Sequence, residues 1–207
     1  MKKYNAFSLL FWLLFSLPNL ADEALYGPAP PADAAFFRVL NLSDDIVALK
    51  VGSEINADVG SYSVSGYGYI SASKFRLELD GVLVMDAAKS GQIFTLVYSG
   101  SGKKTEIIED QPFDNKRMAL VRLYNFSHEQ AIELKTLNGK TSIIGEVGFT
   151  RSKERVIKAV KLPVAVFQGN DMLIDSEPLL LQKNQVTSLF SVKSPNGLSL
   201  IIGATAR

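Results

Sequence analysis

The side chains that most often carry catalysis are scarce in this chain. Its 207 residues include one histidine, His128, and no cysteine. A serine nucleophile needs a base and an orienting acid beside it, but His128 directly follows Ser127, and neighbouring side chains of a strand point to opposite faces. Without cysteine there is no thiolate nucleophile and no Cys-ligated zinc. We therefore expect no catalytic residue, no metal site and no cofactor.

Paired carboxylates are a further kind of catalytic group to consider. Two acids that flank a glycosidic bond can cleave it, and Asp44-Asp45 and Glu109-Asp110 are adjacent acidic pairs. We interpret them as turn and linker residues, because Asn, Ser, Gln and Pro stand beside them. The sequence also lacks a Gly-x-Ser-x-Gly elbow and a phosphate-binding loop. It therefore predicts a protein that is not an enzyme, with a hydrolase or transferase of unrecognised site as the alternative.

Five basic residues cluster between positions 151 and 161. In an extended chain, alternate residues point to the same face. The four odd-numbered residues of this cluster therefore share one face, and Lys158 lies on the other. Such a face can bind an acidic partner or a polyanion, or it can be the solvated edge of a sheet. Tyr67 and Tyr69 likewise place two rings on one face, either for sugar binding or within a sandwich. The candidate interaction surface comprises Arg151, Lys153, Arg155, Lys161, Tyr67 and Tyr69.

The total charge is balanced, but the two halves of the chain differ. The whole chain has 22 basic and 21 acidic residues, which argues against a nucleic-acid-binding protein. Residues 22–112 contain seven basic and 13 acidic residues, a net charge of −6. Residues 113–207 contain 13 basic and eight acidic residues, a net charge of +5. This asymmetry indicates two different partner-binding faces.

The apolar residues form a strand pattern. Hydrophobic residues make up 47% of the chain, which is enough for a folded core. The apolar runs are short, rich in Val, Ile, Phe and Tyr, and separated by Gly, Asn, Asp and Ser, as in strands. No stretch, including residues 152–160, carries a convincing helical stripe with caps at both ends. The predicted strands include residues 36–40, 46–51, 75–79, 93–98, 119–124, 164–167 and 198–202.

A repeat divides the chain. Residues 37–43 and 121–127 share Arg, Asn and Ser at identical positions, at an offset of 84. Residues 91–97 and 184–190 also correspond, at an offset of 93. The Asn-x-Ser of each copy is expected to turn the chain, because both side chains bond nearby backbone groups. We therefore predict an all-β fold of two tandem small antiparallel β-sandwich domains, at residues 35–108 and 118–207, joined by a linker at 109–117.

The N-terminus is typical of a secretory signal peptide at residues 1–21. Lys2 and Lys3 precede an apolar run from Phe7 to Leu17, which Pro18 ends. This run is shorter than the roughly 20 residues of a membrane-spanning helix. We expect cleavage and export of the chain, an extended proline-rich segment at residues 22–34, and no transmembrane segment in the mature chain.

The start of the mature chain resembles a known family. Leu25-Tyr26-Gly27-Pro28 and a proline-rich spacer precede Phe37-Arg38-Val39-Leu40-Asn41. In the order of these segments, in its length and in its two β units, the chain resembles the AlgF family. Members of this family are periplasmic accessory proteins of alginate O-acetylation. The resemblance implies a place beside an inner-membrane acyltransferase and periplasmic SGNH-type enzymes that together acetylate this biofilm exopolysaccharide.

The resemblance further implies a non-enzymatic adaptor that binds those enzymes and is required for acetylation of polymannuronate. It offers no catalytic residues to carry over to this sequence. The alternative is an alginate-binding module of the export and modification complex, with the polymer on the basic second half. The expected partners are the periplasmic and membrane-bound alginate O-acetylation enzymes or alginate itself, and the expected location is the periplasm.

Overall fold

The structure is a computed structural model that describes residues 29–206. Within them the chain forms 19 strands and one 3-10 turn, η1 (Ala72–Lys74), which confirms the all-β prediction. Residues 31–207 form one compact unit. The predicted signal peptide and the Leu25-Tyr26-Gly27-Pro28 segment lie outside the described residues. In the described part, no helix has the length and apolar character needed to cross a membrane.

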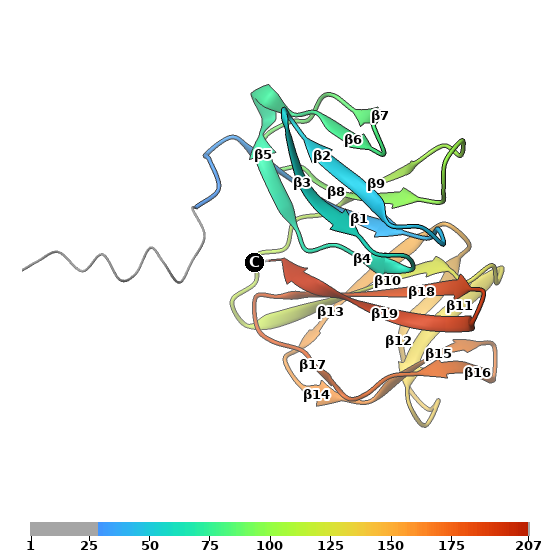
Figure 1. Cartoon of the computed structure of the whole chain (residues 1–207). Coiled ribbons are helices and arrows are strands. Elements are labelled where there is room, and N and C mark those ends of the chain that lie inside the picture. Colours follow the sequence, from blue (N-terminus) through green and yellow to red (C-terminus); the bar gives the residue numbers. More distant parts are fainter. Residues whose placement is uncertain (1–28, 207) are drawn as a thin grey trace, which may run out of the picture. The chain divides into compact units, whose positions relative to one another are not determined.

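The first half of the compact unit forms two packed sheets (Figure 1). Its strands are β1 (Ala34–Asn41), β2 (Val47–Val51), β3 (Glu54–Val59), β4 (Ser63–Val64), β5 (Gly68–Ser71), β6 (Leu77–Leu79), β7 (Val82–Met85), β8 (Ile93–Tyr98) and β9 (Glu106–Asp110). One sheet has the order β4-β1-β8-β9, with β5 also paired to β1, and the other has the order β3-β2-β6-β7. Short strands therefore build a sandwich, as the sequence predicts.

The second half repeats this arrangement (Figure 1). Its strands are β10 (Met118–Phe126), β11 (Ala131–Thr136), β12 (Ser142–Gly148), β13 (Ser152–Lys158), β14 (Lys161–Leu162), β15 (Val164–Gln168), β16 (Asp171–Asp175), β17 (Leu179–Leu180), β18 (Val186–Ser194) and β19 (Gly197–Ala206). One sheet has the order β13-β10-β18-β19, the other has the order β12-β11-β15-β16, and β14 pairs with β17.

The repeated segments occupy equivalent places in the two halves. β1 runs parallel to β8 with Arg38 opposite Thr95, and β10 runs parallel to β18 with Arg122 opposite Ser188. The other strand pairs that the structure describes are antiparallel, as expected. The sequence pattern does not indicate the parallel pair in each half, because its partners are joined by a long connection rather than a tight hairpin.

The junction between the halves differs in one respect from the sequence interpretation. Glu109 and Asp110 belong to β9, where Asp110 pairs with Ile93 and is buried. The interpretation of these two acids as linker residues is therefore wrong, because the ladder with β8 extends through them. Residues 111–117 join β9 to β10. The domain boundaries themselves, at 35–108, 109–117 and 118–207, stay a prediction.

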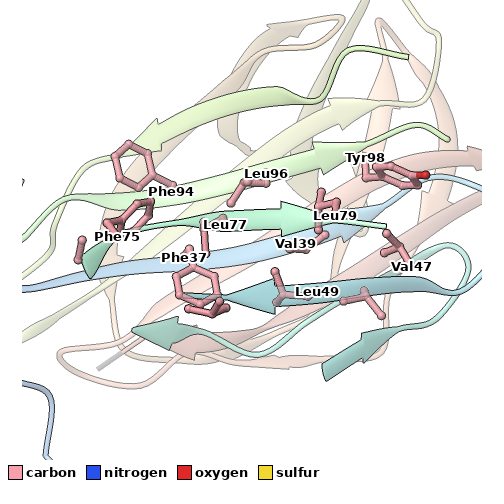
Figure 2. Close-up of a cluster of buried hydrophobic side chains, with 13 residues drawn as sticks. Phe37, Val39, Val47, Leu49, Phe75, Leu77, Leu79, Phe94, Leu96 and Tyr98 are labelled. Carbon is pink, nitrogen blue, oxygen red and sulfur yellow. The ribbon is translucent and has the colours of Figure 1, made fainter. Parts of the chain in front are cut away.

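Alternation along the strands sends one row of apolar side chains into the core of the first half. Figure 2 shows Phe37 and Val39 of β1 in the same cluster as Leu77 and Leu79 of β6. These side chains are almost completely buried. Full burial of each contributes about 1.5–3 kcal/mol, so this row accounts for much of the stability of the first sandwich.

Two further clusters complete the interior of the compact unit. The second half has its own core between its two four-stranded sheets. A third cluster joins the halves, with Leu40 and Val97 from the first packed against Tyr124, Phe190 and other residues from the second. The outer face of the β1 sheet therefore packs against the outer face of the β10 sheet. As a result, β1 and β10 are buried on both faces, unlike a strand of an isolated sandwich.

The repeated Asn-x-Ser closes the turn after β1 and after β10. The Nδ2 of Asn125 donates to the carbonyls of Glu129 and Val147, at 3.0 Å each. Its Oδ1 accepts hydrogen bonds from the N–H and the hydroxyl of Ser127, at 3.1 and 2.7 Å. In the first copy, Asn41 makes the equivalent bonds to Asp45, Val59 and Ser43. The turn role expected for this motif is confirmed.

Gly68 leaves room for a core ring, and this gives a prediction. A Cβ at Gly68 would lie 2.6 Å from Cζ of Phe37, well inside van der Waals contact. We expect Gly68→Ala to lower the free energy of unfolding by about 1–3 kcal/mol, the usual cost of overpacking, as measured by urea unfolding. Gly66→Ala is the matched control, because nothing lies within 4 Å of a Cβ there. Equal losses in the two variants would contradict the argument.

Candidate functional site

A buried ionic cluster lies between the two halves, with Asp110 at its centre. Its Oδ2 accepts a hydrogen bond from the Thr95 hydroxyl at 2.6 Å and lies 3.4 Å from Nη2 of Arg38. Its Oδ1 accepts one from the Tyr124 hydroxyl at 2.6 Å and lies 3.5 Å from Nη1 of Arg122. The two arginines are the repeated arginines of the two copies. One carboxylate from the first half therefore binds a positive charge from each half.

Arg38 is enclosed by aromatic rings. Its Cζ lies 4.6 Å from the ring centroid of Tyr67, 4.8 Å from that of Phe190 and 5.4 Å from that of Tyr124. A guanidinium that is desolvated over aromatic faces gains cation–π attraction. Gly203 provides space on the β19 side, where a Cβ would lie 3.1 Å from Nη1 of Arg38. The first-half arginine is thus held by Thr95, Asp110 and Tyr67 of its own half and by Tyr124 and Phe190 of the second half.

Arg122 joins the cluster to the edge strand β13. Its Nε and Nη2 donate to Oε2 of Glu154 at 2.8 and 2.5 Å, and Nη2 also donates to the carbonyl of Gln111 at 2.9 Å. Burial alone would lower the pKa of Arg122, but Tyr124, Asp110 and Glu154 outweigh it and raise this pKa. Arg122 therefore stays charged, and Glu154 forms an ion pair with it.

The raised pKa of Tyr124 predicts that stability depends on pH in the alkaline range. Burial raises the pKa of Tyr124 above its ordinary value of 10, with Arg38 opposing the change and Asp110 adding to it. A pKa raised by folding stabilises the protein below pH 10, and this contribution is lost as the pH rises further. We therefore expect the free energy of unfolding to fall above pH 10, and to fall less steeply in Tyr124→Phe. Urea unfolding at several pH values measures both slopes, and equal slopes would refute this role of Tyr124.

A cavity of about 270 Å³ lies beside the cluster. Phe36, Ile93, Phe113, Tyr67 and Arg122 contribute to its walls, and no serine, histidine or carboxylate does so within the described residues. Burial raises the pKa of Tyr67, so its hydroxyl stays protonated at neutral pH. The cavity is a mainly apolar recess without a nucleophile or a general base.

The predicted basic face lies at the edge of a sheet. Lys153 and Arg155 are exposed residues of the edge strand β13, and Arg151 is exposed in the turn before it. β13 ends at Lys158, so the exposed Lys161 lies in β14 instead of on the same strand. Arg155 also has a structural contact, because its Nη1 donates to two backbone carbonyls of β12, at 3.0 and 2.9 Å.

The two candidate tyrosines contact the same row of side chains on β1. Tyr67 is half-buried and lies against Arg38. The ring of Tyr69 packs edge-on against Phe36 with the centroids 6.3 Å apart, and it is partly exposed. Tyr67 therefore packs against the ionic cluster from the first half, and sugar binding by these rings stays a prediction.

Ser127 and His128 have separate surroundings. The Ser127 hydroxyl is buried and donates to Oδ1 of Asn125 at 2.7 Å. His128 has a φ of 70°, and its ring packs edge-on against Phe149 with the centroids 5.3 Å apart. Among residues 29–206, no group of three or more histidine and acidic side chains is placed to hold a metal ion. Ser127 is thus committed to a turn.

Sequence reasoning missed the ionic cluster, although part of its signal was visible. Arg38 and Arg122 are the sole charged residues of β1 and β10, and a charged residue inside an apolar strand implies a buried partner. Asp110 carried no comparable signal, because 72 positions separate it from Arg38 in the chain and polar residues follow it.

Known proteins resemble this chain over most of its length. A family model described as "Alginate O-acetyl transferase AlgF" matches residues 13–188. The alginate biosynthesis protein AlgF of Pseudomonas putida is 35% identical over 179 residues, which are 86% of this chain and 82% of that protein. The protein of the same name from Azotobacter vinelandii is 30% identical over 178 residues, 86% of this chain and 81% of that one. A solved structure of the C-terminal domain of AlgF from P. aeruginosa has a TM-score of 0.38 and 33% identity, and the match covers 42% of this chain and 97% of that one.

Proposed function

Because the chain belongs to the AlgF family, we propose that it is a non-catalytic periplasmic adaptor in the O-acetylation of alginate. In this role it bridges the membrane-bound and periplasmic acetylation enzymes. Its relatives are named alginate biosynthesis proteins, and the family description contains the word transferase. The proposal assigns the transfer step to the partner enzymes and the assembly of those enzymes to this chain.

The surroundings of Ser127 and His128 support a role without catalysis. An acetyl-transferring serine must be reachable by substrate and must pass its proton to a base. Ser127 is 2% exposed, and its proton is directed to Asn125. Replacing His128 with alanine should leave acetylation of the secreted polymer unchanged. A normal protein level with acetylation abolished would show that His128 takes part in chemistry.

The observation that carries the adaptor proposal is the set of unneutralised cations around β13. Arg151, Lys153, Arg155, Lys158 and Lys161 take part in none of the ion pairs found among residues 29–206. The nearest acid in sequence, Glu154, is bound to Arg122. Each exposed charge pair contributes only about 0.2–1 kcal/mol, so several such cations together fit an acidic partner surface.

Charge reversal at this face tests the proposal. The variant Arg151→Glu/Lys153→Glu changes two exposed side chains and leaves Arg155 with its backbone contacts. We expect it to keep the melting temperature, to weaken capture of the purified alginate O-acetylation enzymes, and to lower the acetyl content of the secreted polymer. The matched control is Lys140→Glu/Lys183→Glu, which makes the same charge change at exposed sites outside β13. Weakening should also follow added salt, because the Debye length is about 10 Å at 0.1 M and decreases above it.

The same variants separate the second candidate function, an alginate-binding module. Each sugar of polymannuronate carries a carboxylate, so unpaired cations can also bind the polymer. Loss of polymannuronate binding with full enzyme capture would favour the module over the adaptor. If the Arg151/Lys153 variant captures the enzymes and supports acetylation as well as its control does, the basic cluster is a solvated face and the adaptor proposal loses its supporting observation.

A further inference from the structure

The strand that carries the basic cluster has one free edge. β13 lies at the end of its sheet and pairs there with β10 alone (Figure 1). Leu123 of β10 lies opposite Lys153, and Val121 lies opposite Arg155. An unpaired strand edge presents a row of N–H and C=O groups that can accept another strand.

The backbone bonds show which groups of β13 point outward. The N–H of Asn125 donates to the carbonyl of Arg151 at 3.0 Å, which makes this position a hydrogen-bonded one. Such positions alternate along an antiparallel ladder, so Lys153, Arg155 and Ile157 direct their backbone groups toward β10. The even-numbered residues from Ser152 to Lys158 direct theirs away from it. Within residues 29–206, no backbone hydrogen bond beyond the ladder involves these four even-numbered residues.

The side chains along this edge specify the chemistry of an added strand. Lys153 and Arg155 lie on one face of β13. Every second side chain of a strand added to this edge would lie on the same face, beside these two cations. Val156 lies on the other face and is 45% exposed. The matching sequence has acidic residues at alternate positions, to face Lys153 and Arg155, and an apolar residue next to the acid that faces Arg155, to cover Val156. Neither cation takes part in an ion pair within the described chain, although Arg155 also donates to two carbonyls of β12, so their charges are available to a partner.

We infer that β13 is a strand-addition site that binds an extended acidic segment of a partner protein. Backbone bonds from Glu154 and Val156 hold the segment, and its alternating acids pair with Lys153 and Arg155. The inference rests on the proposed adaptor function and deepens it, because it names the binding mode and the kind of segment. A negatively charged polymer without a peptide backbone would use the cations but could not complete this ladder.

Amide exchange in the full-length mature protein distinguishes strand addition from binding by the cations alone, residue by residue. The probe is a seven-residue peptide in which Glu and Val alternate. We expect the amides of Glu154 and Val156 to exchange quickly in the free protein and at least about tenfold more slowly with saturating peptide, while those of Lys153 and Arg155 are slow in both states. The same peptide with a central proline, and oligomannuronate, should leave the even-numbered amides unprotected. Protection by oligomannuronate alone, or no protection by the alternating peptide, would overturn the inference.

A proline variant tests the edge itself. Val156→Pro removes one outward N–H and none of the bonds to β10, and proline is tolerated on an edge strand in this orientation. We expect peptide affinity to fall about five- to tenfold, as for the loss of one hydrogen bond near 1 kcal/mol. Val156→Ala, which keeps the N–H, should stay within about twofold. Equal affinity of the two variants, with unchanged melting temperatures, would overturn strand addition.

Enzyme capture separates this inference from the proposed function. If the Val156→Pro variant captures the purified O-acetylation enzymes as well as Val156→Ala does, strand addition is wrong and the adaptor role stands. If the parent protein captures none of them, the adaptor role fails. The amide pattern with the peptide then decides strand addition independently.

Discussion

Replacing Asp110 with alanine should lower the free energy of unfolding by about 3–5 kcal/mol, the usual effect of leaving a buried charge without its partner. The carboxylate is 1% exposed and lies between the side chains of Arg38 and Arg122, which are 1% and 4% exposed. Its removal also deprives the hydroxyls of Thr95 and Tyr124 of their acceptor. Chemical unfolding at neutral pH measures the loss, which corresponds to a large fraction of the stability of an ordinary domain.

Two further variants identify the cause of that loss. Glu109→Ala is the matched control, because Glu109 precedes Asp110 on the same strand but is exposed, and it should cost less than about 0.5 kcal/mol. Adding Arg38→Met and Arg122→Met to Asp110→Ala should recover much of the stability, since apolar groups of similar size often replace a buried ionic cluster without penalty. If Asp110→Ala costs no more than Glu109→Ala, the ionic cluster does not hold the halves together.

Replacing Asn125 with alanine should lower the free energy of unfolding by about 2–4 kcal/mol, because several buried backbone and side-chain groups lose their partners at once. The side chain is fully buried and bonds the carbonyls of Glu129 and Val147 and both polar groups of Ser127. Asn41→Ala should have a similar effect, because Asn41 has the equivalent position and bonds in the first copy.

The exposed Asn196, in the hairpin between β18 and β19, supplies the comparison. Asn196→Ala should change stability by no more than about 0.5 kcal/mol. Thermal and urea unfolding of the three variants tests the argument. A loss below about 1 kcal/mol in both Asn41→Ala and Asn125→Ala would mean that the repeated asparagines do not fix the turns, and the structural interpretation of the repeat would then fail.

The sequence alone determined the features that depend on short-range physics. The alternation of apolar and charged residues at 75–79 indicated the segment that includes β6, because side chains of a strand point to opposite faces at every step. A short run rich in β-branched and aromatic residues indicated β8. The repeat located the first strand of each half, and the Asn-x-Ser turn followed from bonds between residues two positions apart. The absence of cysteine and the single histidine limit the chemistry available to the chain, because side-chain type alone sets which nucleophiles and bases it can offer.

The tertiary structure decided what depends on contacts between distant residues. A local pattern shows that a strand has two faces, but it does not show that the second face of β1 meets a second sandwich. The position of Asp110 was misread for this reason, because its partners Arg38 and Arg122 lie in other strands and its neighbours in sequence resemble a linker. The basic stretch was likewise found by its composition. Only the pairing of β13 with β10 placed Lys153 and Arg155 on an edge strand. Only the ion pair of Glu154 with Arg122 showed that the nearest acid is already neutralised. Both features depend on long-range contacts that the spacing of charges along the chain does not contain.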